Sequence, residues 1–245
     1  MEYTLEQLRS RHSVRNYEPQ VLSHEIMDEL SGLVEAINIR YSDALRFAMV
    51  YDDPNAFNLF EKHYGTFSGV QNYAVAIIKP QNPNAKEIAG YAGQELAMRA
   101  QALGLATCFI GATYDSTELN LHLKDGEEVS FLLTIGKAAQ DAKVNNHPSL
   151  SPEQFYDNST AFFNLEEAEK RIPSLAVGLD ALACAPSGMN KQPVRVWLAE
   201  DTFLHAGLAE TTDYSLTDLG IAKFNFQAVV PGVWEWGVGG RFQTK

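Results

Sequence analysis

Apolar residues along this chain follow two spacings, one typical of helices and one typical of strands. The most regular helical pattern runs from Ile88 to Leu103, where apolar and small residues recur every three or four positions until Gly104 ends it. Similar spacing predicts further helices over residues 4–9, 23–39, 165–171, 174–184 and 214–230. Short apolar runs predict strands over residues 44–51, 73–79, 129–136, 194–199 and 234–242. The pattern therefore predicts a globular protein that mixes helices and strands.

The helix at 88–103 contains small residues that would let a second helix approach closely, and we expect it to lie in the core. These small residues are Gly90, Ala92, Gly93 and Ala97. A second segment, residues 217–232, resembles residues 90–111, because each reads as a small-residue helix that runs to a glycine turn. We interpret the two segments as a degenerate internal repeat.

Composition and charge exclude several classes of function. The chain has 245 residues, 31 Asp and Glu against 19 Lys and Arg, and a net charge of −12, which argues against a nucleic-acid partner. The longest apolar stretch, Leu175 to Ala185, is interrupted by Asp180 and is shorter than the roughly 20 residues of a membrane span. The N-terminus has neither a positive region nor an apolar region of a signal peptide. We expect a cytoplasmic protein that does not bind membranes.

The cysteines and histidines show no spacing typical of a metal site, so we expect no metal. Cys108 and Cys184 are flanked by apolar residues and read as small buried side chains, not as a disulfide. The chain also lacks a phosphate-binding Walker loop and a G-x-S-x-G turn. The C-terminal run Gly237 to Gly240 is predicted to be a turn.

A basic cluster stands out in this acidic chain between residues 9 and 17. It contains three arginines, His12 and two serines, and its core reads Arg11, Ser13, Arg15. Guanidinium groups form forked, charge-assisted hydrogen bonds with phosphate oxygens, and a serine hydroxyl adds a neutral donor. The cluster therefore predicts a phosphate site. The alternative is a solvated basic face, paired with nearby acids, at the end of the first helix.

A second stretch, residues 185–193, lies between a predicted helix and a predicted strand. Its sequence Ala-Pro-Ser-Gly-Met-Asn-Lys-Gln-Pro is typical of a loop with exposed backbone donors. Such loops commonly contact flat ligands through backbone N–H groups and short polar side chains.

Together the two stretches resemble the nitroreductase family of flavin enzymes, whose marks are an R-x-S-x-R phosphate motif and an A-P-S-x-x-N-x-Q-P loop. The resemblance implies an α+β protein with a nitroreductase-like fold, a central mostly antiparallel sheet flanked by helices, and FMN as cofactor. In that family two subunits form an obligate dimer, and each FMN takes the arginine motif from one subunit and the loop from the other. Here one chain carries both motifs in separate lobes, so we expect an internal pseudo-dimer with one FMN per chain. The expected boundaries are 1–140 for the first lobe, 165–245 for the second, and 141–164 for a connecting arm.

The resemblance also assigns roles to individual residues. The FMN phosphate would be held by Arg11, His12, Ser13 and Arg15, with His12 in place of a second arginine. Pro186, Ser187 and Gly188 would line the isoalloxazine edge, while Asn190 and Gln192 would donate to ring or ribityl oxygens. A backbone N–H near Gly111 would meet flavin N5, although a simple turn glycine explains this residue equally well. No side chain is assigned a catalytic role, because the flavin performs the electron transfer.

The expected reaction is a ping-pong cycle, in which NAD(P)H reduces FMN and an electron-poor acceptor of the nitroaromatic or quinone type then oxidises it. The expected partners are these two small molecules, and the chain would be a monomeric pseudo-dimer or a weak homo-oligomer. Two alternatives stay open. One is a flavin-binding protein of the same fold without turnover, and the other is a flavin-fragmenting or dehalogenating relative.

Overall fold

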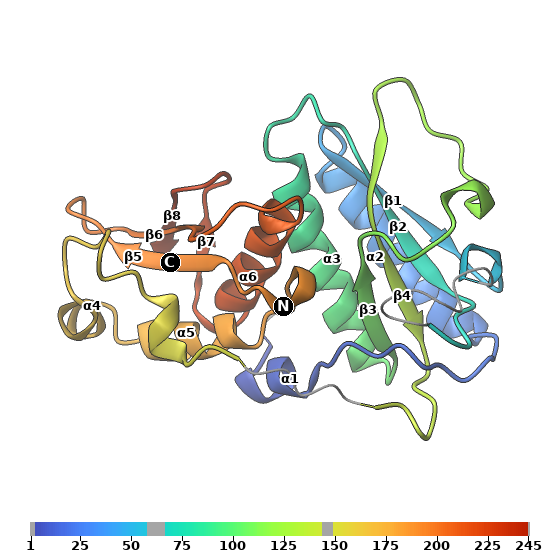
Figure 1. Cartoon of the computed structure of the whole chain (residues 1–245), viewed down its shortest axis with the longest axis horizontal. Helices are drawn as coiled ribbons and strands as arrows, with labels where there is room; N and C mark the ends of the chain where they lie inside the picture. Colours follow the sequence, from blue (N-terminus) through green and yellow to red (C-terminus); the bar gives the residue numbers. More distant parts are fainter. Residues whose placement is uncertain (1–2, 58–66, 144–148, 245) are drawn as a thin grey trace. The chain divides into compact units, whose positions relative to one another are not determined.

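The computed structural model describes residues 3–57, 67–143 and 149–244. The chain divides into two compact units, each with its own sheet. The N-terminal unit comprises Arg11–Ala85 and Glu95–Asn146; the C-terminal unit comprises Met1–Ser10, Lys86–Gln94 and His147–Lys245. Figure 1 labels the elements of both. The domain boundaries expected from the sequence stay a prediction, and this division places residues 1–10 and 86–94 with the C-terminal unit.

The sheet of the N-terminal unit consists of β1 (Leu45–Val50), β2 (Tyr73–Ile78), β3 (Ala106–Ile110) and β4 (Glu128–Gly136). Their order is β1-β2-β4-β3, and every neighbouring pair is antiparallel. Strand β2 is buried along its whole length because it lies inside the sheet. The edge strand β1 is held by helix α2 (His24–Arg40), whose Asn38 side chain accepts the Phe47 N–H at 2.6 Å and donates to the Phe47 carbonyl at 2.9 Å.

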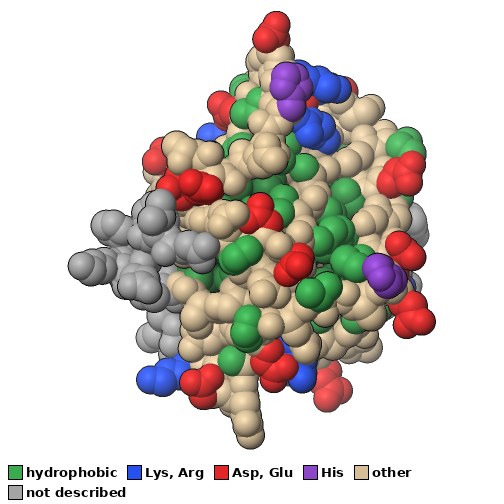
Figure 2. Space-filling view, turned by 90° about the vertical axis from the view of Figure 1, so that its right-hand side faces the viewer, with side chains coloured by type: hydrophobic (Ala, Val, Ile, Leu, Met, Phe, Trp, Pro, Cys, Tyr) green, Lys and Arg blue, Asp and Glu red, His purple; other side chains and the backbone are tan. Residues whose placement is uncertain are grey.

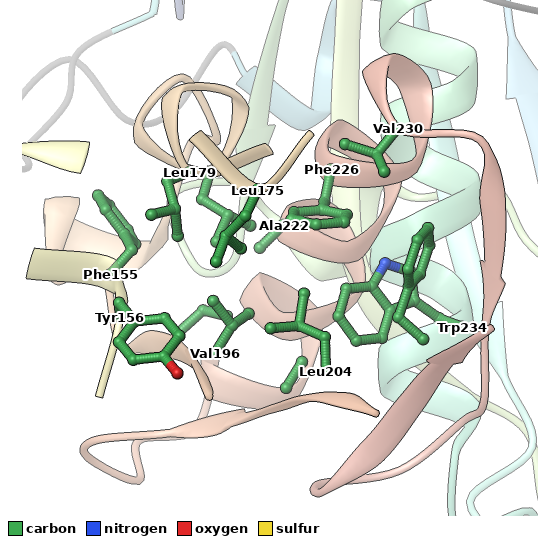
Figure 3. Packing of buried hydrophobic residues seen from close by; sticks show 14 of the residues in the cluster. Phe155, Tyr156, Leu175, Leu179, Val196, Leu204, Ala222, Phe226, Val230 and Trp234 are labelled. Carbon is green, nitrogen blue, oxygen red and sulfur yellow. The ribbon is translucent and has the colours of Figure 1, made fainter. Parts of the chain in front are cut away.

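The sheet of the C-terminal unit consists of β5 (Val194–Leu198), β6 (Leu204–Leu208), β7 (Gly232–Trp234) and β8 (Gly240–Thr244). Helices α5 (Leu175–Ala183) and α6 (Ser215–Val229) pack against its core. Figure 3 shows side chains of these helices, among them Leu179 and Phe226, pointing toward Val196 and Leu204 of the sheet. All four side chains are at most 1% exposed, so this core excludes water.

The remaining elements connect or flank the two sheets. The other α-helices are α1 (Leu5–Ser10), α3 (Ala85–Ala102) and α4 (Leu165–Arg171). Short 3₁₀ turns are η1 (Asn55–Phe57), η2 (Ser116–Glu118), η3 (Pro152–Phe155) and η4 (Gly188–Asn190). Helix α3 contributes residues 86–94 to the C-terminal unit and its remaining residues to the N-terminal unit.

The two sheets repeat one topology. In each unit two strands are followed by a long helix and two more strands, and the spatial order is first, second, fourth, third. Helix α3 occupies this position in the first copy and α6 in the second. The topology thus supports the internal repeat that the small-residue helices suggest.

Within the C-terminal unit, residues 86–94 of α3 pack closely against α6. A Cβ atom on Gly90 would lie 2.0 Å from the Thr217 carbonyl oxygen, and one on Gly220 would lie 1.8 Å from the Glu87 carbonyl oxygen. No larger residue fits at either glycine without moving the backbone. The close helix contact predicted from the small residues of α3 is therefore present, with α6 as the partner.

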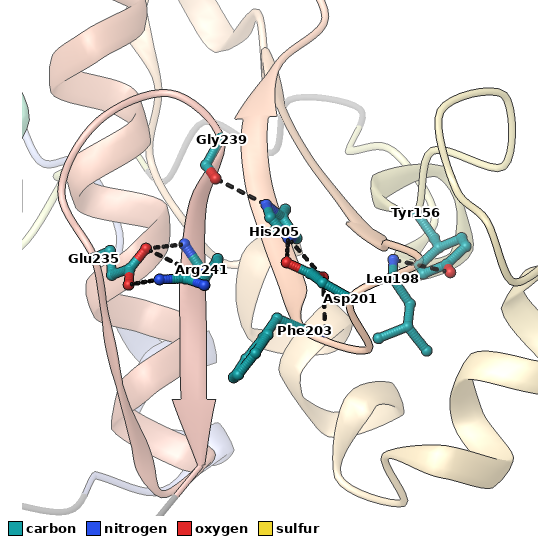
Figure 4. Close-up of polar contacts among 8 residues, drawn as sticks. All are labelled: Tyr156, Leu198, Asp201, Phe203, His205, Glu235, Gly239 and Arg241. Atoms are coloured by element: carbon teal, nitrogen blue, oxygen red, sulfur yellow. Dashed lines mark hydrogen bonds and ion pairs between the residues drawn. The ribbon is translucent and has the colours of Figure 1, made fainter.

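The prediction of a single strand over residues 234–242 is wrong, because this region forms the antiparallel hairpin of β7 and β8. Gly237 and Gly239 have φ angles of 96° and 82°, a left-handed conformation that glycine adopts without strain and that interrupts a strand. Figure 4 shows the forked ion pair across this hairpin, in which Arg241 donates to both carboxylate oxygens of Glu235 at 2.7 and 2.9 Å. The predicted glycine turn is thus the tip of the hairpin.

Strand β6 has no counterpart among the predicted strands, and it lies between β5 and β8. Its His205 ring lies 2.8 Å from the Gly239 carbonyl and 3.1 Å from the Asp201 carboxylate (Figure 4). These contacts tie β6 to the hairpin and to its own preceding turn. Its short sequence contains His and Gly, so the strand depends on pairing with its neighbours.

Cys108 and Cys184 do not form a disulfide with each other. Cys108 is buried as predicted, whereas Cys184 is only half-buried because it lies at the C-terminal cap of α5.

Within the described residues no helix has the length and apolar character needed to cross a bilayer. Figure 2 shows the side that lies to the right in Figure 1, where hydrophobic side chains gather near the middle and acidic side chains surround them.

Candidate functional site

The basic segment that starts at Arg11 is attached to the edge of the N-terminal sheet by its backbone. Ser13 forms a parallel bridge with Thr107 of β3, and the Val14 N–H donates to the Thr107 carbonyl at 3.0 Å. The buried Tyr17 hydroxyl donates to the Val14 carbonyl at 2.6 Å and lies 2.7 Å from the Thr134 hydroxyl of β4. The segment therefore has a fixed path although it is not part of a regular strand.

The side chains of this segment form a compact positive cluster. Arg11 is only 8% exposed, Ser13 and Arg15 are half-buried, and His12 is exposed. Burial raises the pKa of the Cys108 thiol, and the charges of Arg15 and Arg11 and a hydrogen bond from Ser13 oppose that rise. The charges of Arg11 and Arg15 and the Ser13 hydroxyl therefore all act on Cys108 of β3.

His12 does not add a full positive charge at neutral pH. Partial burial lowers its pKa, and the charge of Arg11 lowers it further. The neutral imidazole can still donate one hydrogen bond. Arg11 and Arg15 are thus the permanent cations of the segment.

Replacement of Tyr17 by phenylalanine should loosen the basic segment. The change removes two hydrogen-bond contacts of a buried hydroxyl and leaves the Val14 carbonyl without this donor, which we expect to lower the free energy of unfolding by roughly 1–2 kcal/mol. Chemical denaturation measures the loss. Tyr51→Phe in the same unit is the matched control, because the Tyr51 hydroxyl contacts Met27 and Ser31 of α2 and not the basic segment. An equal loss in both variants would show that Tyr17 has no special role.

Gly111 lies in the same unit as the basic segment. Gly111 is exposed and directly follows β3, whose residues pair with β4. Residues 111–127 then form the connection to β4. Strand β3 therefore links the two sequence features that the N-terminal unit contributes, because Ser13 bridges to its second residue and Gly111 follows its last one.

The loop at residues 185–193 connects α5 to β5 in the C-terminal unit. Pro186, Ser187, Gly188 and Asn190 are half-buried, and Gln192 is 7% exposed. The loop folds back on itself, because the Gln192 N–H donates to the Ser187 hydroxyl at 2.9 Å and the Asn190 N–H donates to the Ser187 carbonyl at 3.0 Å.

The side chain of Gln192 anchors the loop to the preceding segment. Its amide oxygen accepts the Leu150 N–H at 2.9 Å, and its amide nitrogen donates to the Ser149 hydroxyl at 2.7 Å. One amide hydrogen is left for a further acceptor. The side chain of Gln192 therefore holds this end of the loop against residues 149–150.

Asp218 of α6 also contacts this loop, and the sequence analysis did not select it. Its two carboxylate oxygens accept the Gly188 N–H at 3.0 and 3.2 Å, and the residue is 4% exposed. Desolvation raises the pKa of Asp218 to about 7, although the Gly188 N–H opposes the rise. The available signal was an acidic residue within a predicted core helix.

The structure groups the predicted residues by unit. Arg11, His12, Ser13, Arg15 and Gly111 belong to the N-terminal unit, whereas Pro186, Ser187, Gly188, Asn190 and Gln192 belong to the C-terminal unit. A groove of about 540 Å³ on α2 and β1 is lined by none of these residues. No group of three or more potential metal ligands occurs among residues 3–57, 67–143 and 149–244.

Comparison with known proteins identifies the family. The family model described as "Putative TM nitroreductase" matches residues 3–230, and the chain belongs to this nitroreductase family. No curated protein shows significant similarity to the chain.

Solved structures agree with this assignment. A putative nitroreductase from Thermotoga maritima has a TM-score of 0.61 and 14% identity, over 99% of this chain and 93% of the other. An FMN-dependent nitroreductase from Clostridium difficile has a TM-score of 0.50 and 20% identity, over 64% of this chain and 99% of the other. At these identities the comparisons establish the fold, and they confirm the α+β nitroreductase-like architecture expected from the sequence.

Proposed function

We propose that this chain is an FMN-dependent oxidoreductase that transfers electrons from NAD(P)H to an electron-poor acceptor of the nitroaromatic or quinone type. Membership of the nitroreductase family and the FMN-dependent relative support the proposal. The donor, the acceptor and the individual binding residues belong to the proposal. When bound, FMN would accept a hydride from NAD(P)H and pass electrons to the acceptor, and the protein would supply position and hydrogen-bond donors.

The proposal is carried by one observation: the long connections that hold the predicted binding residues occur once each, in different copies of the repeated topology. The connection between α5 and β5 spans residues 184–193 and holds the A-P-S loop, whereas the corresponding connection between α2 and β1 spans only residues 41–44. Conversely, the connection between β3 and β4 spans residues 111–127, whereas that between β7 and β8 spans residues 235–239. Each copy therefore retains elements that the other has shortened, which supports one complete set per chain.

The donor set of the basic segment fits a phosphate monoester. Arg11 and Arg15 offer forked N–H donors with permanent charge, and the Ser13 hydroxyl adds a neutral one. Each charge-assisted bond contributes roughly 1.5–3 kcal/mol, so a few of them would retain the cofactor. We propose that these residues and His12 hold the FMN phosphate, and that Gly111 donates its backbone N–H to the ring.

The loop fits the remaining, less charged part of the cofactor. Pro186, Ser187 and Gly188 offer a half-buried surface with short side chains, and Asn190 and Gln192 carry amide groups. We propose that this loop lines the isoalloxazine edge.

The test is the amount of flavin that the purified protein retains. FMN is added in excess, unbound flavin is removed by gel filtration, and the visible absorption is compared with protein concentration. We expect one FMN per chain on a particle with the mass of one chain. Two per chain would rule out the pseudo-dimer proposal, and no retained flavin would rule out the FMN proposal.

Turnover is tested on the same sample. Anaerobic addition of NADH or NADPH should bleach the flavin absorption, and a nitroaromatic or quinone should restore it. Retained flavin that neither nucleotide reduces would favour a flavin-binding protein without turnover. Conversion of the flavin itself, seen by product analysis in air, would favour a flavin-fragmenting relative.

A further inference from the structure

The loop that we assign to FMN is held in a conformation that its residues do not favour. Met189, Asn190 and Gln192 have φ angles of 49°, 55° and 48°, in the left-handed region. For residues other than glycine this conformation is unfavourable, and it persists only where neighbouring groups enforce it. Met189 is also 69% exposed, so burial of its own side chain does not enforce it. Other contacts must hold this part of the loop.

The first turns of α6 supply such contacts. The Asp218 carboxylate accepts the Gly188 N–H through both oxygens, and Gly188 is the residue before the left-handed pair. A Cβ atom on Gly188 would lie 2.9 Å from the Tyr214 Cβ, so the backbone of the loop rests directly on this end of α6. The Asp218 N–H in turn donates to the Tyr214 carbonyl at 2.9 Å, which joins both contacts to one helical turn.

This arrangement is costly for the protein. Asp218 is 4% exposed, and desolvation raises its pKa to about 7, with the Gly188 N–H as the only opposing contribution. No charged side chain of the described residues contributes to this shift. A neutral acceptor would satisfy the same N–H without burying a charge. The stability of the fold therefore does not require a carboxylate at this position.

We propose that Asp218 is a positioning residue for flavin binding, which fixes the Gly188 backbone so that the 187–192 segment keeps its left-handed, FMN-binding form. The inference rests on the proposed FMN function and names a residue that acts through the loop. Asp218 itself need not touch the cofactor.

Protonation of Asp218 should then affect stability and binding in opposite directions. Its folded pKa lies above the ordinary value of 3.8, so its contribution to stability is full below that value and is lost as pH rises through about 7. The ionised carboxylate accepts the Gly188 N–H more strongly than the neutral acid does. FMN affinity should therefore increase as the pH rises through about 7, whereas the stability contribution is lost between 3.8 and about 7.

The experiment compares the wild-type protein with Asp218→Asn, Asp218→Leu and the control Asp213→Asn. Asp213 precedes α6, is exposed and has the same charge. FMN dissociation constants are measured by flavin fluorescence at pH 6, 7 and 8, and the Gly188 amide is followed by ¹⁵N NMR without flavin. Thermal unfolding at pH 8 verifies that each variant is folded.

We expect Asp218→Leu to bind FMN about tenfold more weakly than wild type at pH 8, as for loss of one hydrogen bond to a charged group. Asp218→Asn keeps an acceptor, so it should bind with intermediate affinity and a flatter pH profile than wild type. Asp218→Asn, which keeps an acceptor without a buried charge, should be at least as thermostable as wild type at pH 8. Only in wild type and Asp213→Asn should the Gly188 amide shift with pH near 7.

Three results would contradict the inference, and each has a different meaning. If wild type binds FMN and a folded Asp218→Leu binds it equally well, Asp218 does not position the loop, while the FMN function stands. If the wild-type protein binds no FMN at any pH, both proposals fail. Wild-type and Asp218→Asn profiles with the same pH dependence would also contradict the role of the Asp218 charge.

Discussion

Replacement of Lys223 by alanine is expected to lower the free energy of unfolding by roughly 3–5 kcal/mol, because it leaves a buried carboxylate without its counter-charge. The Lys223 ammonium is 1% exposed and donates to Glu87 at 2.5 Å and to the carbonyls of Glu235 and Gly237 at 2.9 and 3.0 Å. Glu87 is equally buried, and its second oxygen accepts the Gly237 N–H at 2.7 Å. One ammonium thus connects α3, α6 and the β7–β8 hairpin within the C-terminal unit.

Guanidinium denaturation followed by tryptophan fluorescence measures this loss directly. All three tryptophans, Trp197, Trp234 and Trp236, lie in the C-terminal unit, and the Lys223 ammonium is 5.6 Å from the Trp234 ring. The signal therefore reports on the unit that contains the ion pair.

Two further variants separate the ion pair from simple loss of a side chain. The double variant Glu87→Gln, Lys223→Met removes both charges and keeps the volume, so it should recover much of the loss. Lys170→Ala breaks the exposed Lys170–Glu166 pair of α4 in the same unit, and we expect a cost below about 1 kcal/mol. If Lys223→Ala costs no more than Lys170→Ala, the Glu87–Lys223 pair does not stabilise the C-terminal unit.

Apolar patterning located the long elements of the fold because most of them bury apolar residues along their length. The helix predicted over residues 165–171 has the bounds of α4, and those predicted at 88–103 and 214–230 correspond to α3 and α6. Helices α3 and α6 are buried along most of their length, whereas α4 buries Ala168 alone. The strands β1, β2, β4 and β5 were located for the same reason.

The missed elements are those whose structure depends on their neighbours. Strand β6 has the short sequence Leu-His-Ala-Gly-Leu, and it is a strand because β5 and β8 pair with it on both sides. The hairpin of β7 and β8 was predicted as one strand, since aromatic and apolar residues flank the glycines on both sides. No local pattern specifies either pairing.

In the candidate site, too, local motifs were predicted and long-range contacts were missed. The sequence contains the residues that would touch a ligand, because Arg11, Ser13 and Arg15 form a recognisable local motif. It does not reveal which residues hold this motif in place. Tyr17, for example, is fixed by Thr134 of β4, which lies far along the chain. Asp218 likewise contacts Gly188, which lies 30 residues away in the sequence. Supporting residues are defined by contacts in space, and a single sequence does not display these contacts.

The charge reversal Arg11→Glu is expected to weaken FMN binding by about 1000-fold or more. The change would remove charge-assisted hydrogen bonds worth roughly 1.5–3 kcal/mol each and place a negative charge against the phosphate. Every 1.4 kcal/mol corresponds to a factor of about ten in affinity, so two lost bonds and the added repulsion account for this magnitude. Equilibrium titration with FMN measures the effect, and circular dichroism verifies that the variant is folded.

Arg9→Glu is the matched control, since it makes the same change of charge two residues earlier. Arg9 is exposed, belongs to the C-terminal unit and pairs with Asp180 at 3.1 Å, so its replacement should leave FMN affinity unchanged. Riboflavin provides a second control because it has the same ring without the phosphate. If Arg11 binds the phosphate, Arg11→Glu should weaken FMN far more than riboflavin. Equal losses for both flavins would show that Arg11 shapes the unit instead of binding the phosphate, because only a general disturbance of the site affects a ligand that has no phosphate.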